Sequence, residues 1–403
     1  AKRGTLFTNA HCQAPICNPS RTSVMLGLRP STTGIYLNSP WFRTTKLNRD
    51  RVTLPQHFAG HGYETLTTGK IYHGSKVDPA SFEVVGPRPG QRLKLDERIV
   101  KIEETRSGLW DYGAQAYAEE KFGDYADATW AVEQLQAKHE RPFFLAVGLY
   151  RPHVPWYAPQ RFFDDRPLEK VQLPEVREDD RDDLPEAALN LTDNPTPPSH
   201  EWFVENSQWK PAVQAFLASS SFTDAQVGRI MAALDTSPHA DNTIVVLFSD
   251  HGFHLGEKQR WAKQSLWERS TRVPFIILTP GQKEAQRCTR PVELLSIYPT
   301  LLELCGLPLR DDLEGTSISP LLENPDTKWE HPAITTYQQN NHAVRSEHWR
   351  YIRYADGSEE LYDHRNDPRE WHNLASESEY ADVIAAHRKW LPEKNVPNAK
   401  GRR

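Results

Sequence analysis

A cysteine, an arginine and a predicted helix start lie close together near the N-terminus of this 403-residue chain. Cys17 precedes Asn18 and Pro19, which are typical of a helix N-cap and of the first helical position. The spacing predicts a short helix to about Gly27, with Cys17 at its positively polarised start. Arg21 can direct a forked cation to the same point. The pattern indicates oxyanion chemistry, and a buried structural cysteine beside a surface arginine is the alternative.

Other chemically capable side chains directly follow predicted strands. Apolar runs predict strands over 64–68, 143–149 and 243–249, the last two buried on both faces. Helical patterns lie between strands, which favours an α/β domain around a mainly parallel sheet. Ligands bind beyond the carboxyl ends of such strands, so we expect the side chains that follow them to meet at one edge. These side chains are Lys70, His73, His153, Asp250 and His251.

The motif Cys-x-Pro-Ser-Arg, followed by Leu-Gly-x-Arg-Pro, resembles the signature of type I sulfatases. It spans residues 17–30, with Leu26 where many members have Thr. The strings at 249–257 and 261–263 resemble the second metal-binding segment of that family, and 361–374 resembles its closing segment. The later motifs resemble the iduronate-2-sulfatase-like branch. The resemblance implies an alkaline-phosphatase-like α/β fold, a mainly parallel sheet flanked by helices, with a smaller C-terminal antiparallel-sheet subdomain.

The same resemblance implies roles for single residues. Cys17 would be oxidised after translation to formylglycine, and its hydrate would attack the sulfur of a sulfate ester. The metal would be Ca²⁺, with Mg²⁺ as the alternative, held by Asp250, His251 and Cys17. The alternative role of His251 is to orient a substrate oxygen. Lys70, Lys263 and His153 would bind sulfate oxygens, and His153 would also protonate the leaving alcohol. Arg21 would lower the pKa of the attacking hydroxyl, and His73 would hydrogen-bond to the formylglycine.

Three further aromatic residues are candidates for contact with the substrate. His342 ends a polar loop before a C-terminal strand and is expected to border the pocket, with an ordinary hairpin loop as the alternative. Trp156 and Trp261 flank the predicted site and are suited to stacking on a sugar, with packing in the core as the alternative.

The predicted organisation has one gap. In sulfatases a strand that ends in an Asp-Asp pair precedes the cysteine and supplies metal ligands. No such strand lies upstream of Cys17, so we expect either a fragment of a longer protein or a strand that is genuinely absent. We predict a catalytic domain over 1–322, with an acidic surface insertion without helix or strand pattern at 164–210. Period-two patterns and a terminal helix near 379–390 predict an α+β subdomain over 323–403.

Composition narrows the function classes. The net charge of −6 argues against a general nucleic-acid binder. No run of about 18 apolar residues predicts a transmembrane helix. The four cysteines contain no Cys-x-x-Cys pair, which argues against a zinc or redox site, and Cys288 and Cys305 are expected as free buried thiols.

The resemblance implies a sulfatase that acts on a sulfated sugar or polysaccharide. Its expected partners are this substrate and a formylglycine-generating or anaerobic sulfatase-maturing enzyme, and its expected location is the periplasm or the outside of the cell. A phosphodiesterase or phosphonate monoester hydrolase on the same fold is the first alternative, and activity on model esters separates the two. A non-catalytic sugar-binding relative is the second, suggested by the absent acidic pair.

Overall fold

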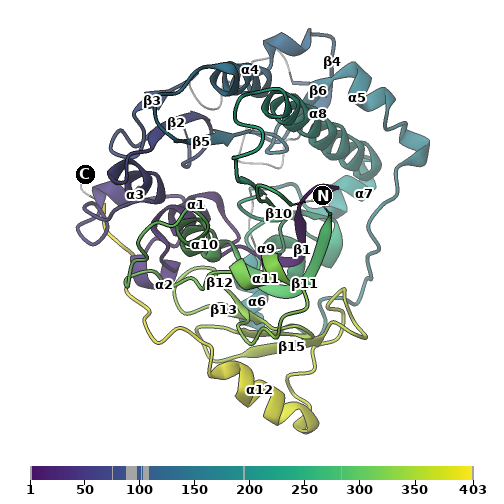
Figure 1. Ribbon diagram of the computed structural model, residues 1–403. Helices are drawn as coiled ribbons and strands as arrows, with labels where there is room; N and C mark the ends of the chain where they lie inside the picture. Colours follow the sequence, from purple (N-terminus) through teal and green to yellow (C-terminus); the bar gives the residue numbers. More distant parts are fainter. Residues whose placement is uncertain are drawn as a thin grey trace.

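Two sheets form the α/β part of the protein (Figure 1). The computed structural model describes residues 2–74, 76–87, 98–100, 102, 109–193, 196–282 and 284–401. The larger sheet has the order β11 (Gln286–Glu293), β1 (Thr5–His11), β10 (Phe275–Leu278) and β7 (Val245–Phe248), with β10 antiparallel to both of its neighbours. The smaller sheet has the parallel order β3 (Val84–Val85), β2 (Glu64–Gly69) and β5 (Phe143–Gly148).

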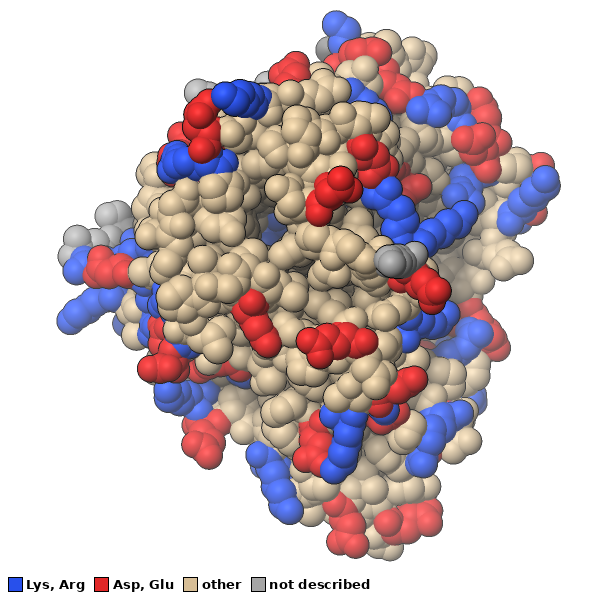
Figure 2. Space-filling view, viewed as in Figure 1, with Lys and Arg blue, Asp and Glu red and all other residues tan. Residues whose placement is uncertain are grey.

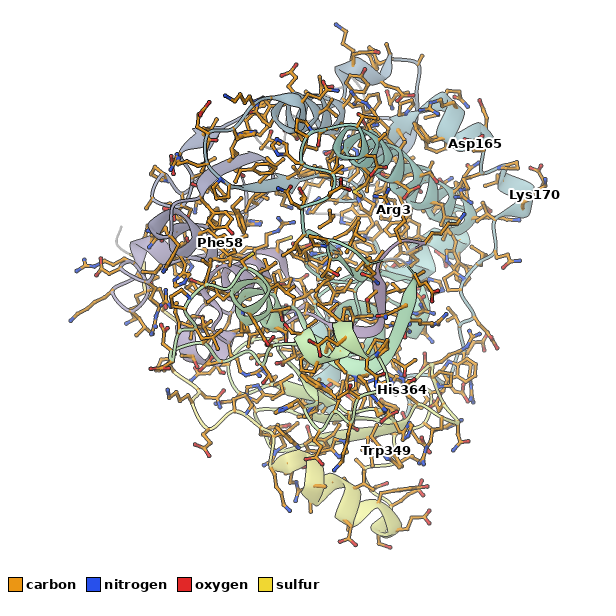
Figure 3. The ribbon with its side chains drawn as sticks, viewed as in Figure 1. Arg3, Phe58, Asp165, Lys170, Trp349 and His364 are labelled. Atoms are coloured by element: carbon orange, nitrogen blue, oxygen red, sulfur yellow. The ribbon has the colours of Figure 1, made fainter. Side chains whose placement is uncertain are left out.

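The same helices cover both sheets. α4 (Gly123–Gln136) and α8 (Trp209–Asp235) pack on one side, where apolar residues of β5 and β7 join one cluster with Leu135 and Leu234. α1 (Cys17–Leu26), α3 (Leu54–Gly60) and α10 (Ile297–Leu304) cover the other side. There Phe58, labelled in Figure 3, lies 5.0 Å from Phe144 between ring centroids. The layered α/β fold predicted from the sequence is confirmed.

The predicted burial of β5 and β7 on both faces is wrong. Residues 143–147 and 245–248 are only half-buried. The reason is the strand order: each strand ends its sheet, and among the described residues neither pairs along its outer edge. Phe144 and Phe248 nevertheless contact one apolar cluster, and Leu145 and Val245 contact the cluster on the opposite side. The two unpaired edges therefore border the same layers of helices.

The C-terminal residues form the predicted antiparallel sheet. Its strands, in order, are β12 (Ala333–Thr336), β13 (His342–Arg345), β14 (Trp349–Arg353) and β15 (Glu359–Asp363), followed by α12 (Ala381–Arg388). Trp349 and His364 mark this region in Figure 3. Buried Arg350 contacts the carboxylates of Glu268 and Glu370, and His364 lies 3.0 Å from Glu370. Because Arg350 and Arg345, which lies 3.3 Å from Glu268, together neutralise the two carboxylates, we interpret this acidic cluster as an ion-pair network that fastens the C-terminal sheet.

The stretch 164–210 contains helices that the sequence did not predict. α6 (Glu186–Thr192) begins after Pro185, and Ser199 caps α7 (His200–Glu205) by accepting a bond from the Trp202 amide. Asp180, in the acidic run, forms a buried 2.7 Å ion pair with Lys258. Because the stretch is highly charged, its sequence pattern predicted neither these short helices nor the contact of Asp180 with Lys258.

Short elements connect these layers. Two-stranded pairs join β4 (Tyr112–Gln115) to β6 (Trp156–Pro159) and β8 (His254–Leu255) to β9 (Trp261–Ala262). The remaining described α-helices are α2 (Pro30–Thr33), α5 (Gln160–Asp164), α9 (Glu268–Thr271) and α11 (Ser319–Glu323). Among the described residues, no helix has the length and apolar character that crossing a membrane requires. Basic and acidic side chains are interspersed on the face that Figure 2 shows.

Two buried histidines make stability depend on pH. Burial, with the nearby Arg260 charge, lowers the pKa of His254 to about 3, and burial lowers that of His342 to about 4. An unfolded histidine titrates near pH ~6.5, so between these values the unfolded chain binds more protons. We expect the melting temperature to fall as the pH drops from ~6.5 towards ~4 and this slope to be shallower in His254→Gln. The exposed His331→Gln is the control, and an equal slope in both variants would contradict the assignment.

Candidate active site

Cys17 begins α1 and is buried. The residue before it, Ile16, occupies the N-cap position with extended backbone. The predicted N-cap, Asn18, lies inside the first turn, so that part of the prediction is wrong. Its side-chain amide instead donates to the carbonyls of Leu37 and Pro40, at 2.9 and 3.0 Å. Those two bonds hold the loop after α2 against the start of α1.

Three nitrogen atoms surround the Cys17 sulfur. The Nζ of Lys263 lies 3.4 Å from Sγ, the Nζ of Lys70 lies 3.7 Å away, and His251 Nε2 lies 3.3 Å away. Burial alone raises the pKa of the thiol, but these neighbouring charges outweigh it and lower the pKa well below the ordinary value. The site therefore stabilises negative charge at the position of this sulfur.

Arg21 binds the protein and not the thiol. Its Nε donates to Asp250 Oδ2 at 2.6 Å, and its Nη1 donates to the carbonyls of Lys70 and, at 3.0 Å, Ile71. Burial raises the pKa of Asp250, but the charges of Arg21, His251 and Lys70 together outweigh burial and lower that pKa to about 2. Arg21 thus keeps Asp250 ionised and joins it to the end of β2.

His153 presents one nitrogen to the site. Its Nδ1 donates to the carbonyl of Val154 at 2.7 Å and lies 3.0 Å from the Tyr150 hydroxyl. This leaves Nε2 as the nitrogen that faces the Cys17 sulfur, and a hydrogen bond from a protonated ring to this sulfur favours the charged form of the imidazole. Burial and the charges of Lys263 and Lys70 lower the pKa of His153 to about 3, so the imidazole is neutral at neutral pH.

Cys17, Asp250 and His251 form a potential metal-binding group. One ligand atom from each lies within 4.8 Å of the other two. His251 Nδ1 donates to the Gly252 carbonyl at 2.8 Å, which leaves Nε2 free to bind a metal. The Asp250 carboxylate suits Ca²⁺ or Mg²⁺, whereas imidazole and thiol are softer ligands. The three groups therefore fit one side of a divalent-metal site, and a hard cation needs further oxygen ligands.

Two predicted residues have no described contact with Cys17. His73 follows Lys70, and its Nδ1 is buried without a hydrogen-bond partner. His342 is buried in β13, where its Nδ1 lies 3.0 Å from the Thr336 hydroxyl. The polar turn before it is a hairpin that a bond from the Tyr337 amide to the Asn341 carbonyl closes. The roles proposed for His73 and His342 stay predictions.

The two tryptophans suggested for sugar stacking pack in the core. Trp156 is 0% exposed and Trp261 1% exposed, and both belong to one aromatic cluster with Phe203. The Phe203 ring stacks on Trp261 with centroids 3.7 Å apart. The stacking interpretation is wrong because no ring face is open to a ligand.

Sequence reasoning missed two supporting residues. The Tyr150 ring lies under the Lys70 ammonium, 5.0 Å from the centroid, besides contacting His153 through its hydroxyl. Ser20 donates its hydroxyl to the Asp250 carbonyl at 2.5 Å. Ser20 lies inside the Cys-x-Pro-Ser-Arg motif and Tyr150 directly follows the predicted strand over 143–149, and these positions were the available signal. The four cysteines are free, with Cys305 only partly buried.

Comparisons with known proteins agree with this geometry. The family model described as Sulfatase matches residues 1–307, and the model for the N-sulphoglucosamine sulphohydrolase C-terminal region matches 256–396. A sulfatase of Formosa agariphila is 40% identical over 98% of this chain and 81% of its own length. Mouse iduronate 2-sulfatase is 30% identical over 77% of this chain and 64% of its own. The phosphonate monoester hydrolase of Agrobacterium radiobacter shares the fold, with a TM-score of 0.76 and 20% identity over 96% of this chain and 88% of that one. The chain belongs to the sulfatase family.

Proposed function

We propose that this protein hydrolyses a sulfate ester of a sulfated sugar, with residue 17 as the nucleophilic position. The observation that carries the proposal is the cluster of Lys70, Lys263 and His251 around the Cys17 sulfur. Sulfatases of this family generally use a formylglycine and a divalent metal ion. A formylglycine made from Cys17 would supply a geminal diol, whose second hydroxyl allows sulfate to be released.

The two lysines are the groups that would bind the sulfate oxygens. Around Cys17 the cations Arg21, Lys70 and Lys263 face a single described carboxylate, that of Asp250. Arg21 is already paired with this carboxylate, so the charges of Lys70 and Lys263 remain for an anion. Fixed cations of this kind stabilise charge as it develops on oxygen atoms in the transition state.

His153 would change its protonation state when an anion binds. In the free site its Nε2 carries no proton, because burial and the lysine charges keep the ring neutral. A sulfate ester between Lys70 and Lys263 would offset those charges and raise the pKa of His153. The protonated ring would then donate to the leaving oxygen of the sugar.

A divalent metal, Ca²⁺ by the resemblance, would be held by Asp250, His251 and residue 17. When bound, it would supply Lewis-acid polarisation of the oxygen at position 17. We propose that residues 1–322 form the catalytic domain and that the further acidic ligands would come from an additional strand that pairs between β5 and β7. The unpaired edges of β5 and β7, which contact the same two apolar clusters, support this location. Asp250 directly follows β7, so a strand parallel to β7 would end beside it.

We also propose that a formylglycine-generating or anaerobic sulfatase-maturing enzyme acts on Cys17 and that the protein works in the periplasm or outside the cell. The first alternative, a phosphodiesterase or phosphonate monoester hydrolase, has the support of a shared fold. The sequence relatives favour the sulfatase. A higher kcat/KM for an aryl phosphonate or phosphodiester than for an aryl sulfate would favour the alternative.

Replacement of Cys17 tests the nucleophilic position. We expect Cys17→Ala to reduce hydrolysis of an aryl sulfate to background, because no side chain remains that can attack sulfur. Cys305→Ala, which changes a partly buried thiol outside the site, should keep the wild-type rate. Intact-mass analysis of the active protein should show loss of sulfur and gain of oxygen at residue 17. Full activity with an unmodified thiol would refute the formylglycine.

Replacement of Lys263 tests the anion-binding role. Lys263→Met should lower kcat by about 10²–10³-fold, the usual effect of removing one preorganised donor. In protein that retains the Cys17 thiol, the same change should raise the thiol pKa, because Lys263 is the strongest of the charges that lower it. The pH dependence of alkylation measures this shift. The exposed Lys389→Met is the matched control, and an unchanged pKa and kcat in Lys263→Met would contradict the role.

A further inference from the structure

A second cavity lies beside the segment that carries Lys263. Its volume is about 280 Å³. None of the residues that contact Cys17 lines it. The lining residues used below are Arg181, Asp193, Ser199, His200, Lys258 and Arg260. They come from the turn before α6, from the residues between α6 and α7 with the first residue of α7, and from the segment before β9.

Arg260 brings a buried and uncompensated charge to this cavity. The side chain donates to the carbonyls of Thr192, Lys263 and Gln264, the last two at 2.7 and 3.3 Å. Among the described residues no carboxylate lies within ion-pair distance of it, although the residue is only 8% exposed. Burial lowers the pKa of this guanidinium to about 10, which reflects the absence of a close counter-charge. A buried cation whose hydrogen bonds go only to neutral carbonyls is costly and indicates an anionic ligand.

Arg181 adds a second cation to the lining of this cavity. Within the described part of the chain, its side chain has neither an ion pair nor a hydrogen bond, and it is half-buried. Lys258, by contrast, is neutralised by Asp180 at 2.7 Å. The only carboxylate among the described lining residues is that of Asp193, which is exposed. The cavity therefore has a net positive lining.

Neutral donors complete the lining. His200 Nδ1 accepts from the Trp261 indole at 3.2 Å, and burial lowers the pKa of His200, so its Nε2 carries the proton of a neutral ring. The Ser199 hydroxyl accepts from the Trp202 amide and keeps its own proton free to donate. Guanidinium groups with N–H and O–H donors are the chemistry that binds a carboxylate or sulfate beside sugar hydroxyls.

One segment of the chain supports both the cavity and the site at Cys17. Arg260 donates to the backbone carbonyl of Lys263, whose ammonium group lies 3.4 Å from the Cys17 sulfur. We propose that this cavity binds a second oxyanion, a carboxylate or a sulfate, of the saccharide whose sulfate ester lies at residue 17. The proposal rests on the proposed function, and it makes the substrate an acidic sugar with at least two negative groups.

Binding measurements in a Cys17→Ala background test the proposal without requiring turnover. The probes are a disaccharide with one sulfate ester and one uronate carboxylate, its counterpart with the carboxylate reduced to an alcohol, and a counterpart with a second sulfate instead. Arg181→Met should weaken calorimetric binding of both dianionic probes by roughly 10- to 100-fold, the effect of losing a hydrogen bond to a charged group. Affinity for the reduced counterpart should stay that of the parent.

The comparison between variants decides the outcome. Arg287→Met removes an exposed arginine on β11 and should change none of the three affinities. Arg260→Lys should weaken dianion binding in the same sense, with the melting temperature measured to show that the fold is retained. Equal loss for all three probes, or no loss in Arg181→Met, overturns the proposal. Whichever dianionic probe binds more tightly identifies the oxyanion, and failure of the aryl sulfate assay would separately contradict the proposed function.

Discussion

One guanidinium group links the strand ends of the two sheets of this protein at the site around Cys17. Arg21, on α1, pairs with Asp250 at the end of β7 and bonds to the carbonyls that follow β2. Among the described residues no strand ladder joins the larger sheet to the smaller one. Arg21 therefore fixes the separation of Asp250 and Lys70, and with it the geometry around Cys17. Loss of one partner from a buried ion pair costs about 3–5 kcal/mol, so this constraint is also a stabilising one.

Without a negative group at position 17, the site that Arg21 organises is electrostatically unfavourable. Burial and the nearby Arg21 and Lys263 lower the pKa of Lys70, while the charge at Cys17 raises it. The ammonium groups of Lys70 and Lys263 both approach the same sulfur, and they repel each other. The rigid ends of separate strands bear this repulsion. A negative group between the two lysines offsets the repulsion between their ammonium groups. This is how a preorganised site gains affinity for charge.

The sequence was sufficient to predict which residues come together around Cys17 but not which atoms each of them contacts. Lys70, Asp250 and His251 follow apolar strands, and the rule that strand ends gather at one edge correctly brought them to Cys17. The N-cap assignment failed because Asn18 found carbonyl partners in a loop about 20 residues away, which local propensity does not encode. The prediction that β5 and β7 are buried on both faces failed because an apolar run does not reveal which strand lies beside it. Composition likewise could not separate stacking from packing for Trp261.

The segment from Lys258 to Gln264 has a strained backbone and contributes residues both to the site at Cys17 and to the second cavity. Left-handed backbone, unfavourable for side chains other than glycine, occurs here at Lys258, Gln259, Ala262 and Gln264. Such strain persists only where surrounding contacts impose it, and these are the buried pair of Lys258 with Asp180 and the bonds from Arg260 to neighbouring carbonyls. The consequence is that Lys263 reaches the Cys17 sulfur while Arg260, three residues earlier, lines the second cavity. The bond from Arg260 to the carbonyl of Lys263 ties the backbone position of the lysine to that of the arginine, so a shift of either residue displaces the other.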